Sequence, residues 1–198
     1  MGLIAVTRYQ TSLENTLSTW GGDADLWVFA YASLIWRPEG NVQEARPAHV
    51  RGYHRALQMW SKVNRGTPEQ PGLVFALISG GSCRGVVQRI ARADVPNYLE
   101  VLWRREMPNP VYDPRWLSAH TPDGPVKALG FTLSRRSPCF TGSLSPDTYR
   151  HIFGSSFGRY GTTLDYARQT HAHLCDLGIE DRALAQVLRF APEEEMQS

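Results

Sequence analysis

Segments typical of β-strands and segments typical of helices are segregated along this chain. Apolar, β-branched and aromatic stretches bounded by turn residues fill its first two-thirds, at 26–31, 47–53, 73–78, 84–90, 116–120 and 126–133. One helical pattern interrupts them, from Asp94 to about Met107, and the last third is helical from Ser145 onward. This order predicts an α+β fold: a small mixed β-barrel or curled sheet with flanking helices.

Turn and capping residues predict where these elements begin and end. Gly80-Gly81-Ser82 and Asp123-Gly124 each lie between two predicted strands, which predicts two hairpins. Asp94, Ser145 and Thr162 or Thr163 are expected to begin helices, and Gly178 is expected to end the helix that begins near Thr163. A last helix is expected from about Asp181.

The length of the chain fits a single domain. Its 198 residues have a mass of 22.3 kDa, which is enough to bury a core. We expect a peripheral segment at 1–24, with a short helix over 11–20, then one domain at 25–191 and an acidic tail at 192–198.

Charge and cysteine content argue against several classes of protein. The net charge is only +2 and the basic residues form no dense run, so we expect no nucleic-acid partner. Three widely spaced cysteines do not predict a disulfide framework. The N-terminus does not have the pattern of a signal peptide, and the longest apolar run, Leu26 to Ala32, is far shorter than a membrane span. We therefore expect a soluble, cytoplasmic protein with no membrane partner.

The helix after Asp94 contains the most informative residue for function. Its apolar residues recur at the spacing of one buried face, at Val95, Tyr98, Leu99, Leu102 and Trp103. Glu106 is the next residue on that face, so it is a candidate general base in an apolar cleft, where burial would raise its pKa. The alternative is a carboxylate at the helix end that simply pairs with an arginine.

The end of the first predicted strand is a second candidate site. Small residues after a buried strand allow successive backbone N–H groups to point at an anion. The candidate binding residues are Val28, Phe29, Ala30, Tyr31, Ala32, Ser33 and Leu34, and Tyr166 is a further candidate on a later helix. The alternatives are an ordinary strand end and a packed tyrosine.

No metal or nucleophile motif accompanies these residues. His171 and His173 are two positions apart on a predicted helix and face different directions, so we expect no metal site there. Neither a G-x-S-x-G elbow nor a phosphate-binding loop is present in the sequence.

Taken together, these segments resemble the ChaC family, the glutathione-specific γ-glutamylcyclotransferases, in their bacterial form. The resemblance extends over residues 26–188 and rests on several motifs in matching order: Val28 to Pro38, Arg65 to Pro68, Pro71 to Leu73, Gly80 to Gly85, Tyr98-Leu99 with Arg105-Glu106, Gly158 to Gly161, and Asp165-Tyr166.

The resemblance implies both a fold and a reaction. The implied fold is a small mixed β-barrel flanked by helices, and the implied reaction splits glutathione into 5-oxoproline and cysteinylglycine without a metal or organic cofactor. Glu106 matches the catalytic glutamate, and Val28 to Leu34 match the loop that holds the γ-glutamyl group. The family has glycine at the positions of Ala30 and Ala32, and alanine suits them only where φ is negative.

Two other functions stay open. One is a cyclotransferase that acts on another γ-glutamyl compound, and the other is a non-catalytic binding or regulatory relative of the enzymes. The oligomeric state is not predicted.

Overall fold

The computed structural model describes residues 2–107 and 111–192 and divides into two compact units. The first unit contains Met1–Arg55 and Leu77–Ser137, and the second contains Ala56–Ala76 and Pro138–Ser198. The domain limits expected from the sequence, 25–191, stay a prediction. The acidic tail expected at 192–198 lies, from residue 193 onward, outside the described residues.

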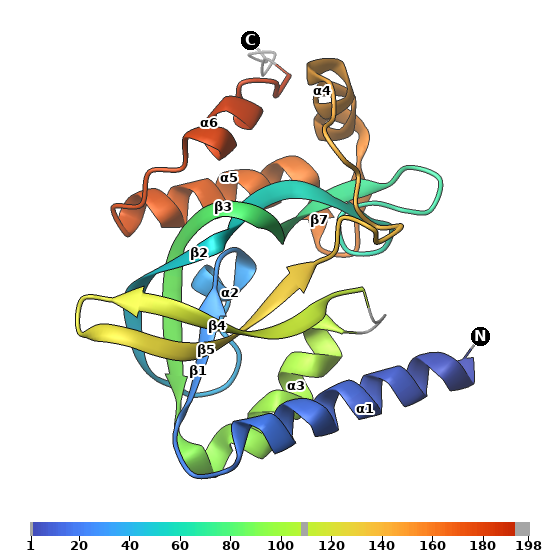
Figure 1. Ribbon diagram of the computed structural model, residues 1–198. Coiled ribbons are helices and arrows are strands. Elements are labelled where there is room, and N and C mark those ends of the chain that lie inside the picture. Colours follow the sequence, from blue (N-terminus) through green and yellow to red (C-terminus); the bar gives the residue numbers. More distant parts are fainter. Residues whose placement is uncertain (1, 108–110, 193–198) are drawn as a thin grey trace. The chain divides into compact units, whose positions relative to one another are not determined.

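The sheet is a closed, mixed barrel of five strands (Figure 1), as the sequence predicted. The strand order is β1 (Leu26–Ala30), β3 (Gly72–Ile90), β2 (Val42–Ser61), β4 (Asp113–Thr121) and β5 (Gly124–Leu133). β1 pairs antiparallel with β3 and parallel with β5, and this parallel pair closes the barrel. Closure leaves β1 with a neighbour on each edge and buries it completely at Val28, Phe29 and Ala30.

One predicted hairpin is confirmed and the other is wrong. β4 and β5 pair antiparallel from Asp113↔Thr132 to Thr121↔Gly124, around a turn in which Gly124 has a φ of 111°. The segments 73–78 and 84–90 instead belong to one continuous strand, β3. Gly80 and Gly81 have positive φ but bend the strand without reversing it, because its two ends have different partners in the barrel: Ile78 pairs with β5 and Ile90 with β1.

Two helices of the first unit lie side by side. Helix α1 (Gly2–Trp20) is longer than the predicted 11–20 and contacts helix α3 (Val95–Glu106), as Figure 1 shows. The apolar face predicted for α3 is confirmed, since all five of its apolar residues are buried. Asp94 lies at the N-cap position of α3 as predicted, at the end of a 3-10 turn (Arg92–Asp94), but its side chain accepts no capping hydrogen bond.

The second unit contains α4 (Pro146–Ser155), the hairpin β6 (Phe157–Gly158) with β7 (Gly161–Thr162), α5 (Thr163–Asp176) and α6 (Arg182–Leu188). Three predicted helix starts are confirmed. The side chains of Ser145, Thr162 and Asp181 cap these helices, since each accepts a hydrogen bond from the backbone N–H three residues later. Gly178, with a φ of 67°, follows the last turn of α5 as expected.

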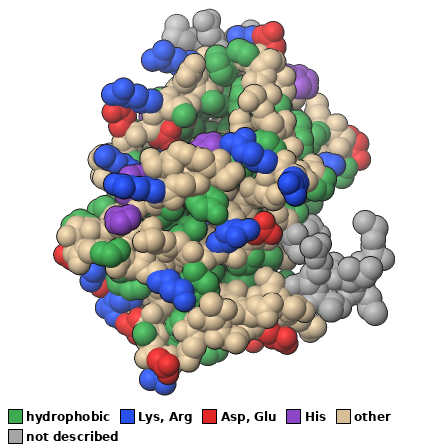
Figure 2. All heavy atoms as spheres, in the orientation of Figure 1, with side chains coloured by type: hydrophobic (Ala, Val, Ile, Leu, Met, Phe, Trp, Pro, Cys, Tyr) green, Lys and Arg blue, Asp and Glu red, His purple; other side chains and the backbone are tan. Residues whose placement is uncertain are grey.

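The charged side chains are dispersed on the face shown in Figure 2. Arginine and lysine side chains lie among acidic and apolar ones there, without a continuous basic stripe. No helix among the described residues is both long and apolar enough to cross a membrane.

Candidate active site

The candidate substrate loop begins where β1 leaves the barrel. The strand ends at Ala30, and the chain turns through Tyr31 and Ala32 into the single-turn helix α2 (Ser33–Trp36). The Ala32 carbonyl accepts a hydrogen bond from the Ile35 amide at 2.8 Å, which closes that turn. The segment 28–34 is therefore a fully buried strand followed by a tight turn.

Three side-chain hydrogen bonds hold this turn in place. The Tyr31 hydroxyl donates to the Phe131 carbonyl on β5 at 3.0 Å. The Arg55 guanidinium on β2 donates to the Tyr31 carbonyl at 2.7 Å, and the Gln88 amide on β3 donates to the Leu34 carbonyl at 2.9 Å. Since β2, β3 and β5 each contribute one bond, the barrel itself positions the loop.

The sequence analysis did not predict that Arg55 and Gln88 hold the loop, although the positions of both in the sequence pattern are unusual. Arg55 occupies an inward position of β2, in phase with the buried Leu57 and Met59, and is itself only 7% exposed. Gln88 interrupts the apolar run of β3 and is buried. A polar residue at a position that alternation assigns to the core needs hydrogen-bond partners, and here it finds them in the loop.

The two alanines fit the backbone of this turn. Ala32 has a φ of −145°, and no described residue other than glycine has a positive φ. Ala30 lies in β1, where Gly85 of β3 gives it room: a Cβ at Gly85 would collide with the Ala30 carbonyl oxygen. Neither alanine is therefore forced into the left-handed conformation that glycine favours.

Glu106 ends helix α3 and continues its buried face, as the spacing predicted. Its side chain is 16% exposed, whereas Glu100 and Arg104 on the other side of the helix are exposed. The Arg105 Nε lies 3.2 Å from a Glu106 oxygen. The pairing with an arginine considered as an alternative is therefore present, together with the enclosure that a buried base requires.

The Arg105 guanidinium joins Glu106 to the loop. It contacts Glu39 at 2.6 Å and donates hydrogen bonds to the Ser33 hydroxyl at 3.1 Å and to the Arg37 carbonyl at 2.7 Å. Helix α3 is thereby tied to the turn that follows β1. The candidate base and the candidate loop thus share one ionic cluster, Glu39, Arg105 and Glu106.

Burial sets the proton affinity of this cluster. Enclosure of the side chain raises the pKa of the Glu106 carboxyl; Arg105 opposes this effect and Glu39 adds to it. Burial, followed by the charges of Glu39 and Glu106, also raises the pKa of the Tyr98 hydroxyl, which keeps that group neutral. A carboxyl with raised pKa is a stronger base than an exposed one, as proton abstraction near neutral pH requires.

Three buried polar atoms have no hydrogen-bond partner among the described residues. They are the Gln88 Oε1, the Tyr98 hydroxyl and the Trp103 Nε1. Such atoms are costly when they are left unsatisfied. They belong to β3 and α3, the strand that anchors the loop and the helix that carries Glu106.

Tyr166 belongs to the second unit. It lies on α5 and is buried, with its ring centroid 5.3 Å from that of Phe75 and the Arg65 guanidinium carbon 4.7 Å above the ring. The packed tyrosine considered as the alternative is therefore present. Its role in substrate binding stays a prediction.

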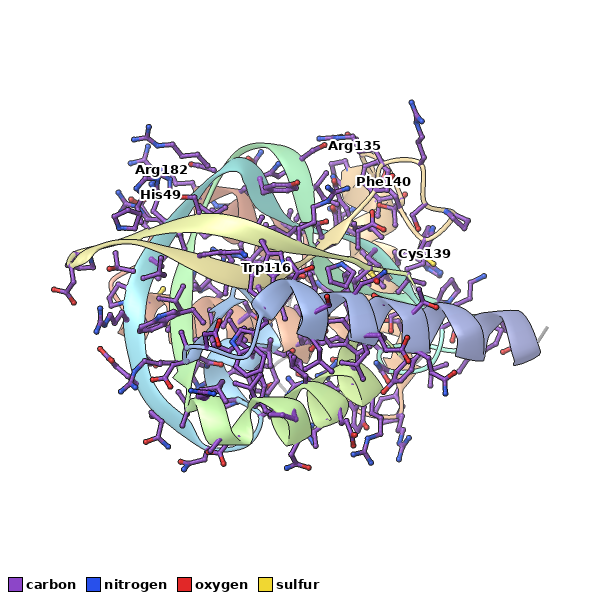
Figure 3. All side chains as sticks on the ribbon, turned by 60° about the horizontal axis from the view of Figure 1, so that its bottom comes forward. His49, Trp116, Arg135, Cys139, Phe140 and Arg182 are labelled. Atoms are coloured by element: carbon purple, nitrogen blue, oxygen red, sulfur yellow. The ribbon has the colours of Figure 1, made fainter. Side chains whose placement is uncertain are left out.

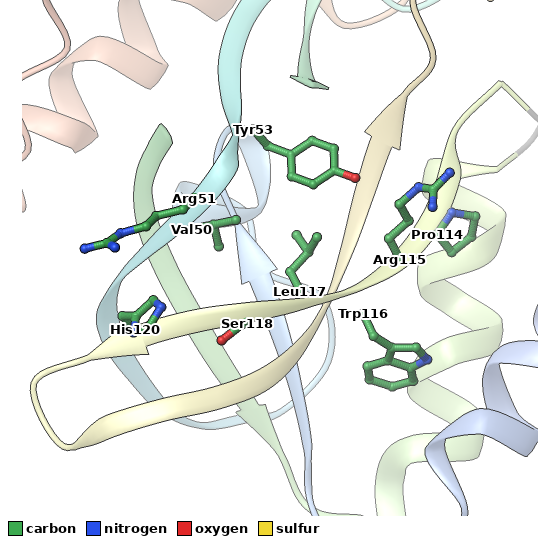
Figure 4. Close-up of a pocket in the computed structure, with 9 residues that line it drawn as sticks. All are labelled: Val50, Arg51, Tyr53, Pro114, Arg115, Trp116, Leu117, Ser118 and His120. Carbon is green, nitrogen blue, oxygen red and sulfur yellow. The ribbon is translucent and has the colours of Figure 1, made fainter. Parts of the chain in front are cut away.

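Two surface clefts of the first unit are separate from these residues. One, of about 510 Å³, lies between β2 and β4, with Arg51, Tyr53, Arg115 and His120 along its walls (Figure 4). The other, of about 440 Å³, lies between α1 and β4, where Trp116 forms part of its wall (Figure 3). Neither is lined by Glu106 or by any residue of 28–34.

The described residues contain no group of three histidine, cysteine, aspartate or glutamate side chains placed to hold a metal ion. His171 and Cys175 form a pair on α5, with 3.9 Å between the Cys175 Sγ and the imidazole nitrogens. Cys83, Cys139 and Cys175 all lie among the described residues, and none of them forms a disulfide.

Comparison with known proteins agrees with this geometry. The profile of the family described as ChaC-like protein matches residues 26–193. The glutathione-specific gamma-glutamylcyclotransferase of Escherichia coli (strain K12) is 31% identical over 178 residues, which is 89% of this chain and 77% of the relative. Glutathione-specific gamma-glutamylcyclotransferase 1 of Homo sapiens is 28% identical over 85% of this chain and 79% of its own.

A solved structure shows the same fold. A crystal structure of a yeast gamma-glutamyl cyclotransferase specific to glutathione superposes with a TM-score of 0.77 at 20% identity, over 85% of this chain and 96% of that one. The mixed barrel with outer helices is thus the fold of the gamma-glutamyl cyclotransferases. Within that class, the chain belongs to the ChaC-like family.

Proposed function

We propose that this protein is a glutathione-specific γ-glutamylcyclotransferase that converts glutathione into 5-oxoproline and cysteinylglycine. The observation that carries the proposal is the link from the enclosed Glu106 carboxylate, through Arg105, to Ser33 in the turn after β1. Membership of the ChaC-like family and the printed activity of the relatives support it. A cytoplasmic location, expected from the sequence, is part of the proposal.

The reaction is an intramolecular acyl transfer. The α-amino nitrogen of the γ-glutamyl unit attacks its own γ-carbonyl carbon and forms the C–N bond of a five-membered lactam. The C–N bond to the cysteinyl nitrogen then breaks. No water is consumed, and no protein nucleophile is needed because the substrate supplies its own.

Glu106 moves the protons that the reaction must transfer. At neutral pH the α-amino group is mostly an ammonium ion, which cannot attack a carbonyl. The attacking nitrogen loses two protons in all, one before it attacks and one as the lactam forms. The Glu106 carboxyl takes up each of them and passes it to the departing cysteinyl nitrogen, which ends as an ammonium ion. The net proton count does not change, so one carboxyl group serves as both base and acid.

The turn after β1 holds the substrate in the geometry of attack. Backbone groups of Val28 to Leu34, at the end of β1, contact the substrate. The three side-chain hydrogen bonds that hold this turn keep those groups rigid. Folding a flexible γ-glutamyl chain against its own carbonyl can supply about 7–11 kcal/mol of the barrier reduction. Tyr166 stays a predicted substrate-binding residue in this proposal.

The test is a glutathione digest with detection of both products. Purified protein is expected to release 5-oxoproline and cysteinylglycine in equal amounts. Glu106→Gln keeps the side-chain shape without the base, so turnover is expected to fall by about 10²-fold or more while the circular dichroism spectrum is retained. Near-normal turnover in this variant would exclude Glu106 as the base.

A donor series decides the substrate. 5-Oxoproline release is compared among glutathione, γ-glutamyl amino acids and γ-glutamyl amines. Faster turnover of another donor would assign the protein to that compound instead. Binding of glutathione without release of either product would identify a non-catalytic relative.

A further inference from the structure

The Arg105 guanidinium is shared between two carboxylates. It lies 2.6 Å from an oxygen of Glu39 and 3.2 Å from an oxygen of Glu106, so the contact to Glu39 is the shorter one. All three side chains are largely enclosed, with exposures of 19% for Arg105, 23% for Glu39 and 16% for Glu106. In such surroundings charges act on one another more strongly than in open water.

The remaining donors of Arg105 hold the guanidinium on the Glu39 side. Its terminal nitrogens donate to the Arg37 carbonyl and the Ser33 hydroxyl, both in the segment that leads to Glu39. Gly40 follows with a φ of 56°, and a Cβ there would come within 3.2 Å of the Tyr98 ring. The chain around Glu39 therefore packs closely against helix α3.

If Arg105 paired with Glu106 alone, Glu106 would be a weak base. A guanidinium beside a carboxylate stabilises the ionised form and weakens its attraction for a proton. A second carboxylate that binds the same guanidinium cancels much of that effect. Glu39 occupies that position.

We propose that Glu39 is a positioning residue of the cyclotransferase site, which binds Arg105 and so prevents this guanidinium from pairing fully with Glu106. Glu39 touches neither substrate nor product; it acts through Arg105. The inference rests on the function proposed above and names the residue that keeps Glu106 able to take up a proton.

The charged and titratable groups that act on Glu106 are Arg105 on its own helix and Glu39 on the segment packed against that helix. Burial and the charges of Glu39 and Glu106 raise the pKa of the Tyr98 hydroxyl, so this group stays neutral. Removal of the Glu39 charge leaves Arg105 with Glu106 as its carboxylate partner. The pKa of Glu106 therefore falls, and the carboxylate becomes a weaker base.

The experiment measures kcat/KM for glutathione against pH in the wild type and in Glu39→Gln. Activity rises with pH as Glu106 loses its proton, and in Glu39→Gln this rise is expected about one pH unit lower. The plateau is expected to be about 3–10-fold lower because the base is weaker. Glu39→Asp keeps the charge and should retain the wild-type position of the rise.

Glu44→Gln is the matched control. Like Glu39, Glu44 is a partly exposed carboxylate that pairs with arginine; its partners are Arg46 and Arg89, its exposure is 32%, and it belongs to β2. In Glu44→Gln, kcat/KM should rise at the same pH as in the wild type. A Glu39→Gln profile that keeps the wild-type position would overturn the proposal, even with a lower plateau, because a merely structural role lowers activity without moving the pH dependence.

A second measurement separates this inference from the proposed function. The Glu106 carboxyl carbon is titrated by NMR in protein labelled with ¹³C-glutamate, and Glu106→Gln identifies its signal. A lower Glu106 pKa in Glu39→Gln supports the inference, whereas an equal or higher pKa overturns it. This readout needs no turnover, so a wild type that does not cleave glutathione refutes the proposed function alone.

Discussion

The Arg55 guanidinium donates a 2.7 Å hydrogen bond to the backbone carbonyl of Tyr31, from a position 24 residues later in the chain. The same side chain donates to the Arg84 carbonyl at 3.1 Å, next to the bend of β3. Arg55 thus joins the turn after β1 to a second strand of the barrel. A buried guanidinium that bridges two carbonyls fixes the distance between them, and this keeps the turn after β1 rigid.

Loss of this bridge should affect binding more than chemistry. In Arg55→Met the Tyr31 and Arg84 carbonyls each lose a donor, at a cost of about 1–3 kcal/mol per group left unsatisfied. We expect KM for glutathione to rise by about tenfold or more, with a lower melting temperature. Arg51→Met changes an exposed arginine on the same strand and should alter neither quantity. An unchanged KM in Arg55→Met would show that the loop is held without Arg55.

Substitution of Glu106 should stabilise the protein at neutral pH. Burial raises the folded-state pKa of this carboxyl above its value in the unfolded chain. Its contribution to stability is therefore complete below the unfolded pKa and is lost as pH rises through the folded pKa. The free energy of unfolding of Glu106→Gln does not fall in this way as pH rises, because glutamine carries no charge at any pH.

Urea unfolding of the wild type and Glu106→Gln at pH 5 and pH 8 tests this. The variant should have the higher free energy of unfolding at pH 8, and the difference should shrink at pH 5. A variant that is less stable than the wild type at pH 8 would mean that the ion pair with Arg105 outweighs the cost of burial.

Ala32→Gly should leave the enzyme nearly unchanged. The φ of −145° at Ala32 is accessible to alanine, so glycine relieves no left-handed strain. We expect kcat/KM within about threefold of the wild type and a free energy of unfolding within about 1 kcal/mol. Steady-state kinetics with glutathione measure the first quantity. A large gain in kcat/KM would show that the Ala32 methyl group crowds the substrate.

Gly85→Ala should destabilise the barrel. The added Cβ would collide with the Ala30 carbonyl oxygen and lie 3.1 Å from the Phe29 ring, so β1 and β3 would have to separate. We expect a loss of about 1–3 kcal/mol. Gly154→Ala, in helix α4 with only an ordinary contact at 3.5 Å, should instead gain up to about 1 kcal/mol. Thermal melts compare the two, and equal melting temperatures would contradict the close contact at Gly85.

The amino-acid sequence alone determined the features that depend on neighbours along the chain. The spacing of apolar residues defined the buried face of α3 and placed Glu106 on it, because a helix has a fixed period. Asp123-Gly124 predicted the β4–β5 hairpin, and Ser145, Thr162 and Asp181 predicted helix starts, because turns and caps need particular residues at particular positions.

Only the tertiary structure decided the features that depend on partners far along the chain. Gly80-Gly81-Ser82 has the composition of a hairpin turn, yet β3 continues through it because barrel closure gives its two ends partners on β5 and β1. Tyr31 meets Phe131 across 100 residues, and Arg105 meets Arg37 across 68. No local pattern encodes such pairs, because they form only when the closing barrel brings its strands and α3 to the same place.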